Sequence, residues 1–268
     1  MVEGVHFPVH AAPEKIAYRA LAAAISDLAA MGAKPSHFTL SLTLPDADEG
    51  WLCGFSQGLK LCCSKYGVTL VGGDTTKGPL VIAIQVHGFS PKGQALRRSG
   101  AKVGDIIAVT GTLGDAGAAL SFLEKVDVSK DAAFLLSRYY SPSPRIVQGE
   151  VLRGLATSCI DISDGLLADM AHLADSSALR FEIDIEKLPL SESLKNIQGD
   201  KARKLALTAG DDYELLFTIP ESLWASLAGT SKDSIFTPIG VVRRGAGVYV
   251  MQNNEALKFT RSGFQHFE

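Results

Sequence analysis

The spacing of apolar residues in the first third of the chain predicts alternating helices and strands. Residues 13–32 ("PEKIAYRALAAAISDLAAMG") repeat at helical spacing, with a proline suited to the first turn and a glycine suited to the end. Residues 36–45 ("SHFTLSLTLP") alternate apolar and polar side chains, which predicts a strand with one buried face. A second helical pattern covers about 49–66, and strand patterns follow at 68–71 and 79–89. The predicted order is helix, strand, helix, strand, strand.

A polar, turn-rich stretch at residues 90–105 ("SPKGQALRRSGAKVGD") separates this part from a second one of similar character. Beyond it, helices are expected after the glycine-rich turn near 113, from Pro144, and after the acidic turn near Gly165. Strand patterns occur at 105–111, 156–162, 179–189, 210–220 and 234–251. We therefore predict an α/β (α+β) protein of two domains, residues 1–103 and 104–268, each with a mixed sheet backed by helices.

Composition narrows the class of protein. The 268 residues are 46% hydrophobic and 21% charged, which is typical of a soluble globular chain with enough apolar side chains for two cores. The formal net charge of -3, with both signs interspersed, gives no electrostatic footprint for nucleic acid or anionic lipid. No apolar run approaches the length of a membrane span, and the first 15 residues do not resemble a signal peptide. We expect a cytoplasmic protein.

Four acidic clusters are the candidate chemistry. They are Ser26-Asp27, Gly72-Gly73-Asp74, Asp161-Ile162-Ser163-Asp164 and Gly210-Asp211-Asp212. The last three are expected where an apolar strand gives way to a turn. Asp27 instead lies inside an alanine-rich helix, where aspartate is unfavourable and is rarely buried without a partner.

Each cluster taken alone also has a structural explanation. An aspartate after two glycines commonly forms a turn, and the acids of "DISDG" could cap the helix that starts near Gly165. Together, however, the clusters offer at least five carboxylates without histidine or cysteine neighbours. Oxygen-only ligands favour hard cations, above all magnesium, which usually carries phosphate among its remaining ligands. The combination therefore predicts a magnesium site that binds phosphate.

Six stretches in one order resemble the thiamine-monophosphate kinase family: "ISDLAAMGA", "LVGGDTTKGPL", "RRSGAKVGD", "SPSPRI", "IDISDGL" and "GDDYELLFT". The wider superfamily includes aminoimidazole ribonucleotide synthetase and selenophosphate synthetase. The resemblance implies its two-domain fold, ATP as co-substrate, thiamine monophosphate as substrate, magnesium as cofactor, and a homodimer formed through the N-terminal sheets.

The resemblance also implies roles for individual residues. Magnesium would be held by Asp27, Asp74, Asp161 and Asp164. ATP would be contacted by Gly73, Asp74, Arg98 and Ser163, with Asp74 and Arg98 acting at the transferred phosphate. Thiamine monophosphate would be contacted by His6, Asp211 and Phe264. Physical reasons support two of these: a guanidinium pairs well with phosphate oxygens, and an aromatic ring can stack on the cationic thiazolium. Arg98 in a solvated turn and Phe264 as a packing residue are the simpler alternatives.

The expected reaction is the ATP-dependent phosphorylation of thiamine monophosphate to thiamine diphosphate. Direct phosphoryl transfer needs positioning and charge neutralisation more than covalent chemistry, which fits a chain without a catalytic His or Cys dyad. "TGTLGDAGAAL" resembles a phosphate-binding turn but lacks the Lys-Ser/Thr of a P-loop, so it is interpreted as a helix start.

Further family ligands, in a glycine-Asp-Asp turn and a Ser/Thr-Asp strand end, would precede "MVEGVHFP". We expect that this chain is truncated and has weak activity. The alternatives are a selenophosphate synthetase-like enzyme of the same superfamily, and a nucleotide-binding protein without catalysis.

Overall fold

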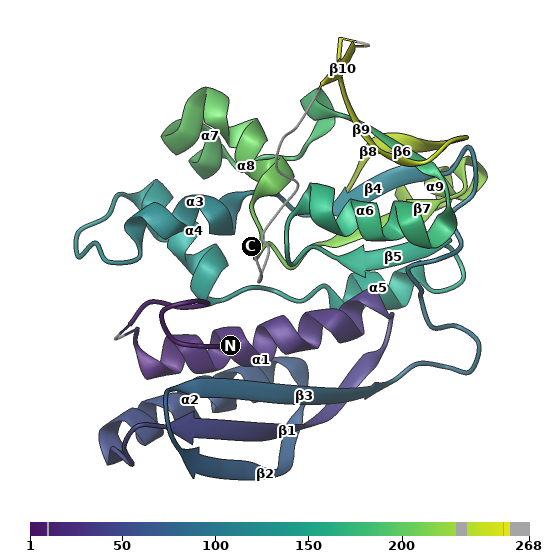
Figure 1. Cartoon of the computed structure of the whole chain (residues 1–268). Helices are drawn as coiled ribbons and strands as arrows, with labels where there is room; N and C mark the ends of the chain where they lie inside the picture. The colour runs from purple at the N-terminus through teal and green to yellow at the C-terminus, as the bar shows by residue number, and fades with distance from the viewer. Residues whose placement is uncertain (10, 229–234, 254, 258–268) are drawn as a thin grey trace.

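The computed structural model describes residues 1–9, 11–228, 235–253 and 255–257. Its N-terminal unit has the element order predicted from the sequence (Figure 1). The elements are α1 (Pro13–Ala30), β1 (Lys34–Leu44), α2 (Glu49–Tyr66), β2 (Thr69–Lys77) and β3 (Val81–Phe89). Local sequence explains the helix ends. Pro13 opens α1, the Asp48 side chain accepts a 2.6 Å hydrogen bond from the Trp51 amide at the start of α2, and Gly67 ends α2 with φ of +66°.

The three strands form a mixed sheet in the order β2-β1-β3, with β2 parallel and β3 antiparallel to β1. Helices α1 and α2 lie on the same side of this sheet (Figure 1). Phe38 and Leu42 of β1 are buried toward the helices, whereas Ser41 is exposed, as the alternating pattern predicts. The opposite face, called here the open face, carries the hydroxyl pair Thr43–Thr76 at 3.1 Å.

The C-terminal unit contains a seven-stranded sheet in the described part of the chain. Its order is β10-β9-β6-β8-β4-β7-β5, and only the β6–β9 pair is parallel. The strands are β4 (Ile106–Thr110), β5 (Ser158–Asp161), β6 (Arg180–Asp184), β7 (Leu215–Ile219), β8 (Phe236–Arg243), β9 (Gly247–Gln252) and β10 (Glu255–Leu257). Both sheets are mixed and backed by helices, so the predicted fold class is confirmed.

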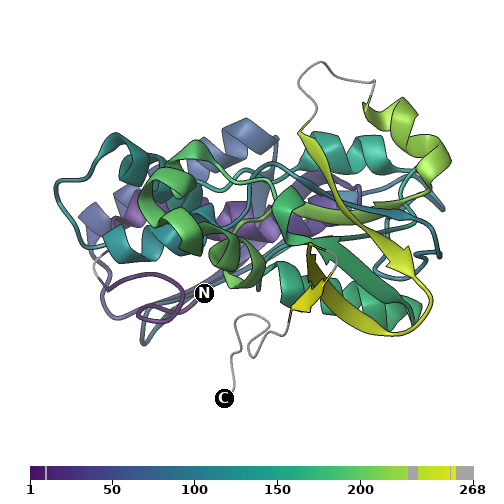
Figure 2. The same cartoon turned by 90° about the horizontal axis from the view of Figure 1, so that it is seen from above.

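Helices surround this sheet and extend beyond it. They are α3 (Asp115–Ala119), α4 (Lys130–Tyr140), α5 (Ile146–Leu152), α6 (Leu166–Ser177), α7 (Glu192–Gln198), α8 (Ala202–Thr208) and α9 (Glu221–Ala228), with 3-10 turns at Leu120–Phe122, Ile185–Lys187 and Gly199–Lys201. From above, the sheet lies at one end of the molecule and the helices α3, α4, α7 and α8 at the other (Figure 2).

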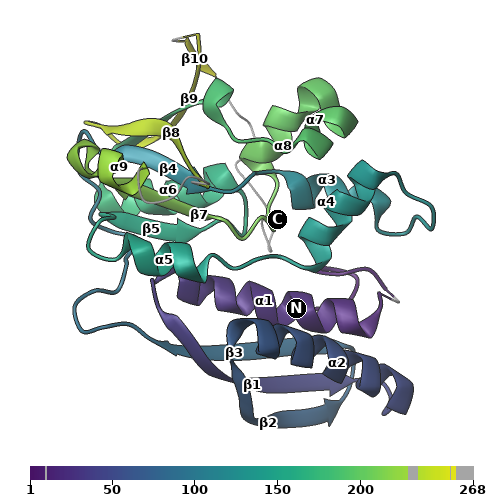
Figure 3. The ribbon, with the colours of Figure 1, turned by 180° about the vertical axis from the view of Figure 1, so that it is seen from behind.

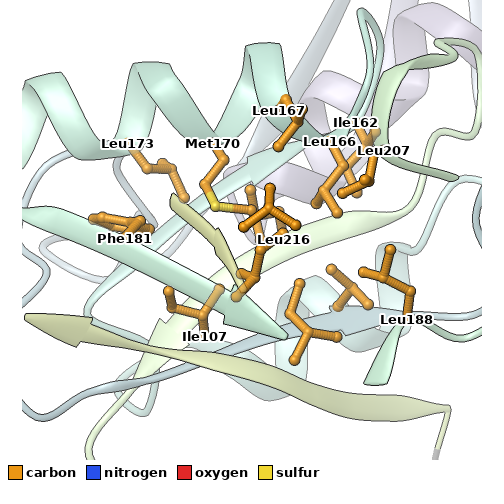
Figure 4. Packing of buried hydrophobic residues seen from close by; sticks show 14 of the residues in the cluster. Ile107, Ile162, Leu166, Leu167, Met170, Leu173, Phe181, Leu188, Leu207 and Leu216 are labelled. Carbon is orange, nitrogen blue, oxygen red and sulfur yellow. The ribbon is translucent and has the colours of Figure 1, made fainter. Parts of the chain in front are cut away.

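Two large apolar cores stabilise the two units. In the C-terminal unit, α6 packs Leu166, Met170 and Leu173 on the sheet residues Phe181 and Leu216 (Figure 4). The N-terminal core lies between the three-stranded sheet and its two helices. Helix α1 lies between this sheet and the C-terminal unit (Figures 1 and 3), so its two sides serve different parts of the protein.

Several sequence expectations need correction. Asp74 does not lie at a strand end: β2 continues through it to Lys77, because residues 75–77 keep pairing with β1. Asp211 and Asp212 precede β7 instead of following a strand. The helices α4, α7, α8 and α9 were not predicted from the sequence, although serine side chains cap the starts of α4 and α7. The segment from 90 to 105 joins the two units, and the boundary between residues 103 and 104 stays a prediction. No helix within the described ranges is long and apolar enough to cross a membrane.

Candidate functional site

Two of the acidic clusters are hydrogen-bonded to each other across the end of the C-terminal sheet. Strand β5 ends at Asp161 and pairs antiparallel with the start of β7 at Leu215. The pairing continues beyond both strands: the Tyr213 amide donates to the Ile162 carbonyl at 2.8 Å, and the Asp211 amide donates to the Ser163 carbonyl at 2.9 Å. The turns 161–165 and 210–214, which are 49 residues apart in sequence, therefore form one surface.

Helix α1 brings a third cluster to this surface. The buried Ser26 hydroxyl donates a 2.7 Å hydrogen bond to Asp161 Oδ2. Burial raises the pKa of Asp161 to about 6; the Ser26 hydrogen bond and Arg98 oppose this rise, and the nearby Asp27 carboxylate adds to it. Burial also raises the pKa of Asp27, again against the effect of Arg98. Asp27, Asp161 and Arg98 are thus electrostatically coupled.

Asp169 of α6 organises the turn from inside. Its Oδ2 accepts hydrogen bonds from three successive backbone amides, those of Ser163 and Asp164 at 3.0 Å and that of Gly165 at 3.2 Å. Burial raises the pKa of Asp169 to about 7; the amide donors oppose the rise, and the carboxylates of Asp164 and Asp161 add to it. A buried acceptor that holds three amides fixes the backbone from which Asp161 and Asp164 project.

The substrate candidates meet at the other end of the same helix. Arg19 of α1 is 1% exposed and lies 2.7 Å from Asp211 Oδ1. Its guanidinium stacks over the Tyr139 ring at 3.9 Å and donates a 2.7 Å hydrogen bond to the Tyr139 carbonyl. The Tyr139 hydroxyl in turn donates to the His6 carbonyl at 2.9 Å. Arg19 and Tyr139 therefore link His6 and Asp211, which are 205 residues apart.

A pocket of about 540 Å³ opens beside this link. Its lining mixes apolar groups, among them Leu120 and Tyr139, with polar and charged ones, including Glu124 and Lys125. Phe7 and Pro8, which follow His6 in the chain, also line it.

A buried ionic network supports the turn 210–214 from behind. The Glu214 carboxylate, fully buried, is bound by Arg138 at 2.7 Å, by Arg145 Nε at 2.6 Å and by the Thr110 hydroxyl at 2.6 Å. Burial alone would raise the pKa of Glu214, but these partners hold it below its ordinary value. Asp212 Oδ2 accepts the Gly114 amide at 2.8 Å. "TGTLGDAGAAL" thus serves packing and a helix start, as interpreted from the sequence.

Asp74 and Gly73 are not part of this surface within one chain. Asp74 pairs with Ser41 in the parallel β1–β2 ladder, so its side chain lies on the open face, which points away from α1. Asp74 is exposed, and its carboxylate accepts a 2.9 Å hydrogen bond from the amide of its own neighbour, Thr75. A Cβ atom at Gly73 would overlap the Leu40 carbonyl, which explains the glycine by close strand packing. Phe264 lies outside the described residues.

The donor chemistry fits a hard cation only with further ligands. The Asp27 carboxylate adds to the raised pKa of Asp161, so a cation beside the pair would be favourable. Both side chains offer only oxygen ligands. Among the residues that the structure describes, no group of three His, Cys, Asp or Glu side chains converges closely enough to hold a metal ion unaided. Magnesium commonly binds one or two carboxylates and completes its shell with water and phosphate, so this arrangement is compatible with it.

Comparison with known proteins places the chain in a family. Its residues 1–90 match the AIR synthase related protein, N-terminal domain, and residues 102–256 match the corresponding C-terminal domain. It is 45% identical to the thiamine-monophosphate kinase of Escherichia coli strain K12 over 274 residues, which is 100% of this chain and 84% of that protein. The chain belongs to the thiamine-monophosphate kinase family.

Solved structures agree. The crystal structure of thiamine-monophosphate kinase from Stenotrophomonas maltophilia K279a superimposes with a TM-score of 0.90 at 41% identity, covering 96% of this chain and 84% of that one. AaThiL complexed with AMPPCP and TMP gives a TM-score of 0.89 at 35% identity, covering 98% of this chain and 84% of that one. The family and fold predicted from the sequence are therefore confirmed, and the chain is a member of a family of kinases.

Three residues of this thiamine-monophosphate kinase family site were missed in the sequence: Arg19, Asp169 and Glu214. Arg19 sits among apolar residues of an amphipathic helix, where a charge on the buried face was a usable signal. Asp169 lies five residues after Asp164, on the buried face of its helix. Glu214 directly follows the acidic turn, but nothing in the sequence indicates that Arg138 and Arg145 would reach it.

Proposed function

We propose that this chain catalyses the ATP-dependent phosphorylation of thiamine monophosphate to thiamine diphosphate. The names of its relatives and the AMPPCP and TMP bound by AaThiL support this, because AMPPCP is an analogue of ATP. The observation that carries the proposal is the position of α1. Arg19 and Ser26 bind the two acidic turns from one helix, so the predicted substrate residue Asp211 and the predicted magnesium ligand Asp161 share a surface.

The spacing along α1 suits a transfer between two bound phosphates. Arg19 and Ser26 are seven residues, or two helical turns, apart and therefore on the same side of the helix, about 10 Å apart along its axis. That distance accommodates the acceptor at one end and the phosphate chain of ATP at the other. The acceptor phosphate is ionised at neutral pH, so orientation and charge neutralisation suffice and no strong base is required.

We propose magnesium as the cofactor, held by Asp27, Asp161 and Asp164. When bound, it would supply positive charge to the transferring phosphoryl group. Arg98, coupled to both Asp27 and Asp161, would contact ATP phosphate with its guanidinium, and Ser163 would contact ATP from the turn that Asp169 holds. His6, Asp211 and Phe264 keep their proposed contacts with thiamine monophosphate.

Asp74 and Gly73 enter this proposal only together with a homodimer. The open face of the N-terminal sheet exposes Phe89 at 68% and carries a stacked His37–His87 pair with ring centroids 4.9 Å apart. An uncovered sheet face with exposed aromatic residues supports association of two copies. Asp74 would then lie in the interface, and its roles at ATP and magnesium would depend on that assembly. Sedimentation equilibrium tests this part separately.

The test of function is thiamine diphosphate formation from thiamine monophosphate, ATP and magnesium, followed by chromatography. We expect Asp161→Asn to lose activity by about a hundredfold or more, because one neutral amide replaces a charged ligand. Asp175→Asn on the exposed side of α6 is the matched control and should keep the rate. Product formation at equal rates by wild type and Asp161→Asn would refute the assignment of Asp161. Nucleotide binding without any product would favour a non-catalytic protein.

A further inference from the structure

Arg19 is an almost completely buried cation at the candidate site. It is 1% exposed, although arginine is seldom buried without a specific partner. Its guanidinium makes three contacts, all with the C-terminal unit: Asp211 Oδ1, the Tyr139 carbonyl and the Tyr139 ring. Burial alone would lower the pKa of Arg19, but the negative charge of Asp211 keeps it raised, so Arg19 stays charged.

The loop that presents Asp211 is strained. Asp211 has φ of +71° and Tyr213 has φ of +52°, a left-handed region that is unfavourable for a residue with a side chain. The loop is held by the amide hydrogen bonds of both residues to the turn 161–165 and, through Glu214, by two partly buried arginines. Strain that the surroundings enforce in this way is characteristic of functional loops.

The two oxygens of the Asp211 carboxylate have different surroundings. Oδ1 is engaged twice, by Arg19 at 2.7 Å and by the Tyr213 hydroxyl at 3.1 Å. No described residue donates a hydrogen bond to Oδ2, and the Asp211 side chain is 33% exposed. One oxygen is therefore held by two protein donors, while the other keeps unused acceptor capacity on a partly exposed side chain.

We propose that Arg19 is a positioning residue of the substrate site. By holding Oδ1, it presents Oδ2 of Asp211 to a hydrogen-bond-donating heterocycle of the substrate. Because Arg19 neutralises most of the Asp211 charge, the group recognised there is an N–H donor, such as an exocyclic amine, in preference to a strongly charged cation. This inference rests on the proposed function, in which Asp211 contacts thiamine monophosphate.

The same guanidinium also fixes the His6 side of the site. Arg19 stacks on Tyr139, whose hydroxyl holds the His6 carbonyl. Loss of Arg19 would release both Asp211 and Tyr139, which holds the His6 carbonyl. It would leave in place the hydrogen bond from Ser26, two turns further along α1, to Asp161 of β5. The structure therefore predicts a selective loss of binding for the thiamine substrate, with ATP binding retained.

The experiment compares Arg19→Met, Arg19→Lys and the control Lys15→Met, each in the otherwise unchanged 268-residue chain. Lys15 lies one turn earlier on α1, is exposed, and stacks on Tyr140 at 5.0 Å, so it matches Arg19 in helix and contact type but not in its contact with Asp211. Initial rates give KM for thiamine monophosphate, KM for ATP, and kcat. Thermal shifts with thiamine monophosphate alone report binding independently of turnover.

We expect Arg19→Met to raise KM for thiamine monophosphate by about tenfold or more, as loss of a charged hydrogen bond implies, with KM for ATP changed less than about twofold. The KM of Arg19→Lys for thiamine monophosphate should lie between the values of wild type and Arg19→Met. An ammonium keeps the charge but cannot bind Asp211 and the Tyr139 carbonyl at once as the planar guanidinium does. Lys15→Met should match wild type. In an Asp211→Asn background, Arg19→Met should add little.

Three outcomes overturn the inference. An unchanged KM for thiamine monophosphate in a folded Arg19→Met protein would do so, as would equal increases of both KM values, which indicate a general structural role. Full additivity with Asp211→Asn would also contradict it. If the wild type forms thiamine diphosphate, any of these three results refutes only the role of Arg19 and leaves the proposed function in place. A wild-type chain that neither phosphorylates nor binds thiamine monophosphate would instead refute the proposed function and the inference with it.

Discussion

The Ser26 hydroxyl donates a 2.7 Å hydrogen bond to Asp161 Oδ2 across 135 residues of sequence. Ser26 is fully buried and Asp161 is 5% exposed, so water cannot replace this bond. The contact joins α1 of the N-terminal unit to the end of β5 in the C-terminal unit. It also opposes the effect of burial on the pKa of Asp161, so it keeps this carboxylate closer to its charged form.

Ser26→Ala should therefore raise the pKa of Asp161 above its value of about 6. At pH 6.5 a larger fraction of Asp161 would be protonated, and we expect catalytic efficiency to fall several-fold there and to recover toward pH 8. A pH profile of kcat/KM measures this shift. Ser64→Ala on the exposed side of α2 is the control. An acidic limb that does not move would show that the hydroxyl has no influence on Asp161.

The raised pKa values of Asp161 and Asp169, about 6 and about 7 against 3.8 for an ordinary aspartate, predict how stability depends on pH. Between pH 4 and 7 the unfolded chain releases these protons while the folded chain retains them. The two groups therefore stabilise the fold fully below pH 3.8, and this contribution is lost as pH rises through about 7, by up to about 1.4 kcal/mol per pH unit for each group.

Urea denaturation of metal-free protein from pH 5 to 8 tests this contribution. Asp169→Asn should flatten the decline, since an amide does not titrate, whereas the exposed Asp175→Asn should leave it unchanged. An identical slope in wild type and Asp169→Asn would contradict a raised pKa at this position.

Glu214→Gln should be among the most destabilising single substitutions in the chain. Arg138 and Arg145 both bind this buried carboxylate, and the amide would remove the charge that both guanidiniums share, leaving Arg138 with the more distant Asp115. We expect a loss of about 3–5 kcal/mol in the free energy of unfolding, measured by chemical denaturation. Glu221→Gln, at the exposed start of α9, should change it by less than about 0.5 kcal/mol. Comparable effects at the two positions would show that the network contributes little.

A comparison of Gly111 with Gly67 separates the steric cost of an added Cβ atom from the cost of backbone strain. Both have left-handed φ values, +55° and +66°, so alanine costs each about 1–2 kcal/mol. A Cβ at Gly67 meets nothing within 4 Å, whereas one at Gly111 would overlap the Glu214 carboxylate and lie 2.7 Å from Arg145 Nη2.

Gly111→Ala should therefore be more destabilising than Gly67→Ala by about 2 kcal/mol, because it displaces a buried ion pair. Thermal and urea unfolding of the two variants measure the difference. Equal losses would mean that the Glu214–Arg145 pair shifts without cost.

Local patterns determined most of the secondary structure of the N-terminal unit. The helices from Pro13 and from Glu49 were predictable because proline, aspartate and glycine at their ends act within a few residues, and β1 because its side chains alternate. The family was identifiable because six of its characteristic stretches occur in one order along the chain. By contrast, α4, α7 and α8 were not predicted; they are short, and their buried residues form one apolar cluster with α3 that exists only in the folded chain.

Only the tertiary structure decided which acidic residues meet. Asp27 and Asp161 are brought together because α1 crosses the end of β5, and Asp211 joins Ser163 because β5 and β7 are antiparallel neighbours. Asp74 belongs to an equally clear motif, yet its side chain lies on the open face of the N-terminal sheet, away from α1. Its face depends on the register between β2 and β1, which the motif itself does not determine. Arg19 acts through Tyr139 and Asp211, 120 and 192 residues away, and Asp169 through amides up to 6 residues away. The burial that strengthens these contacts exists only in the folded chain.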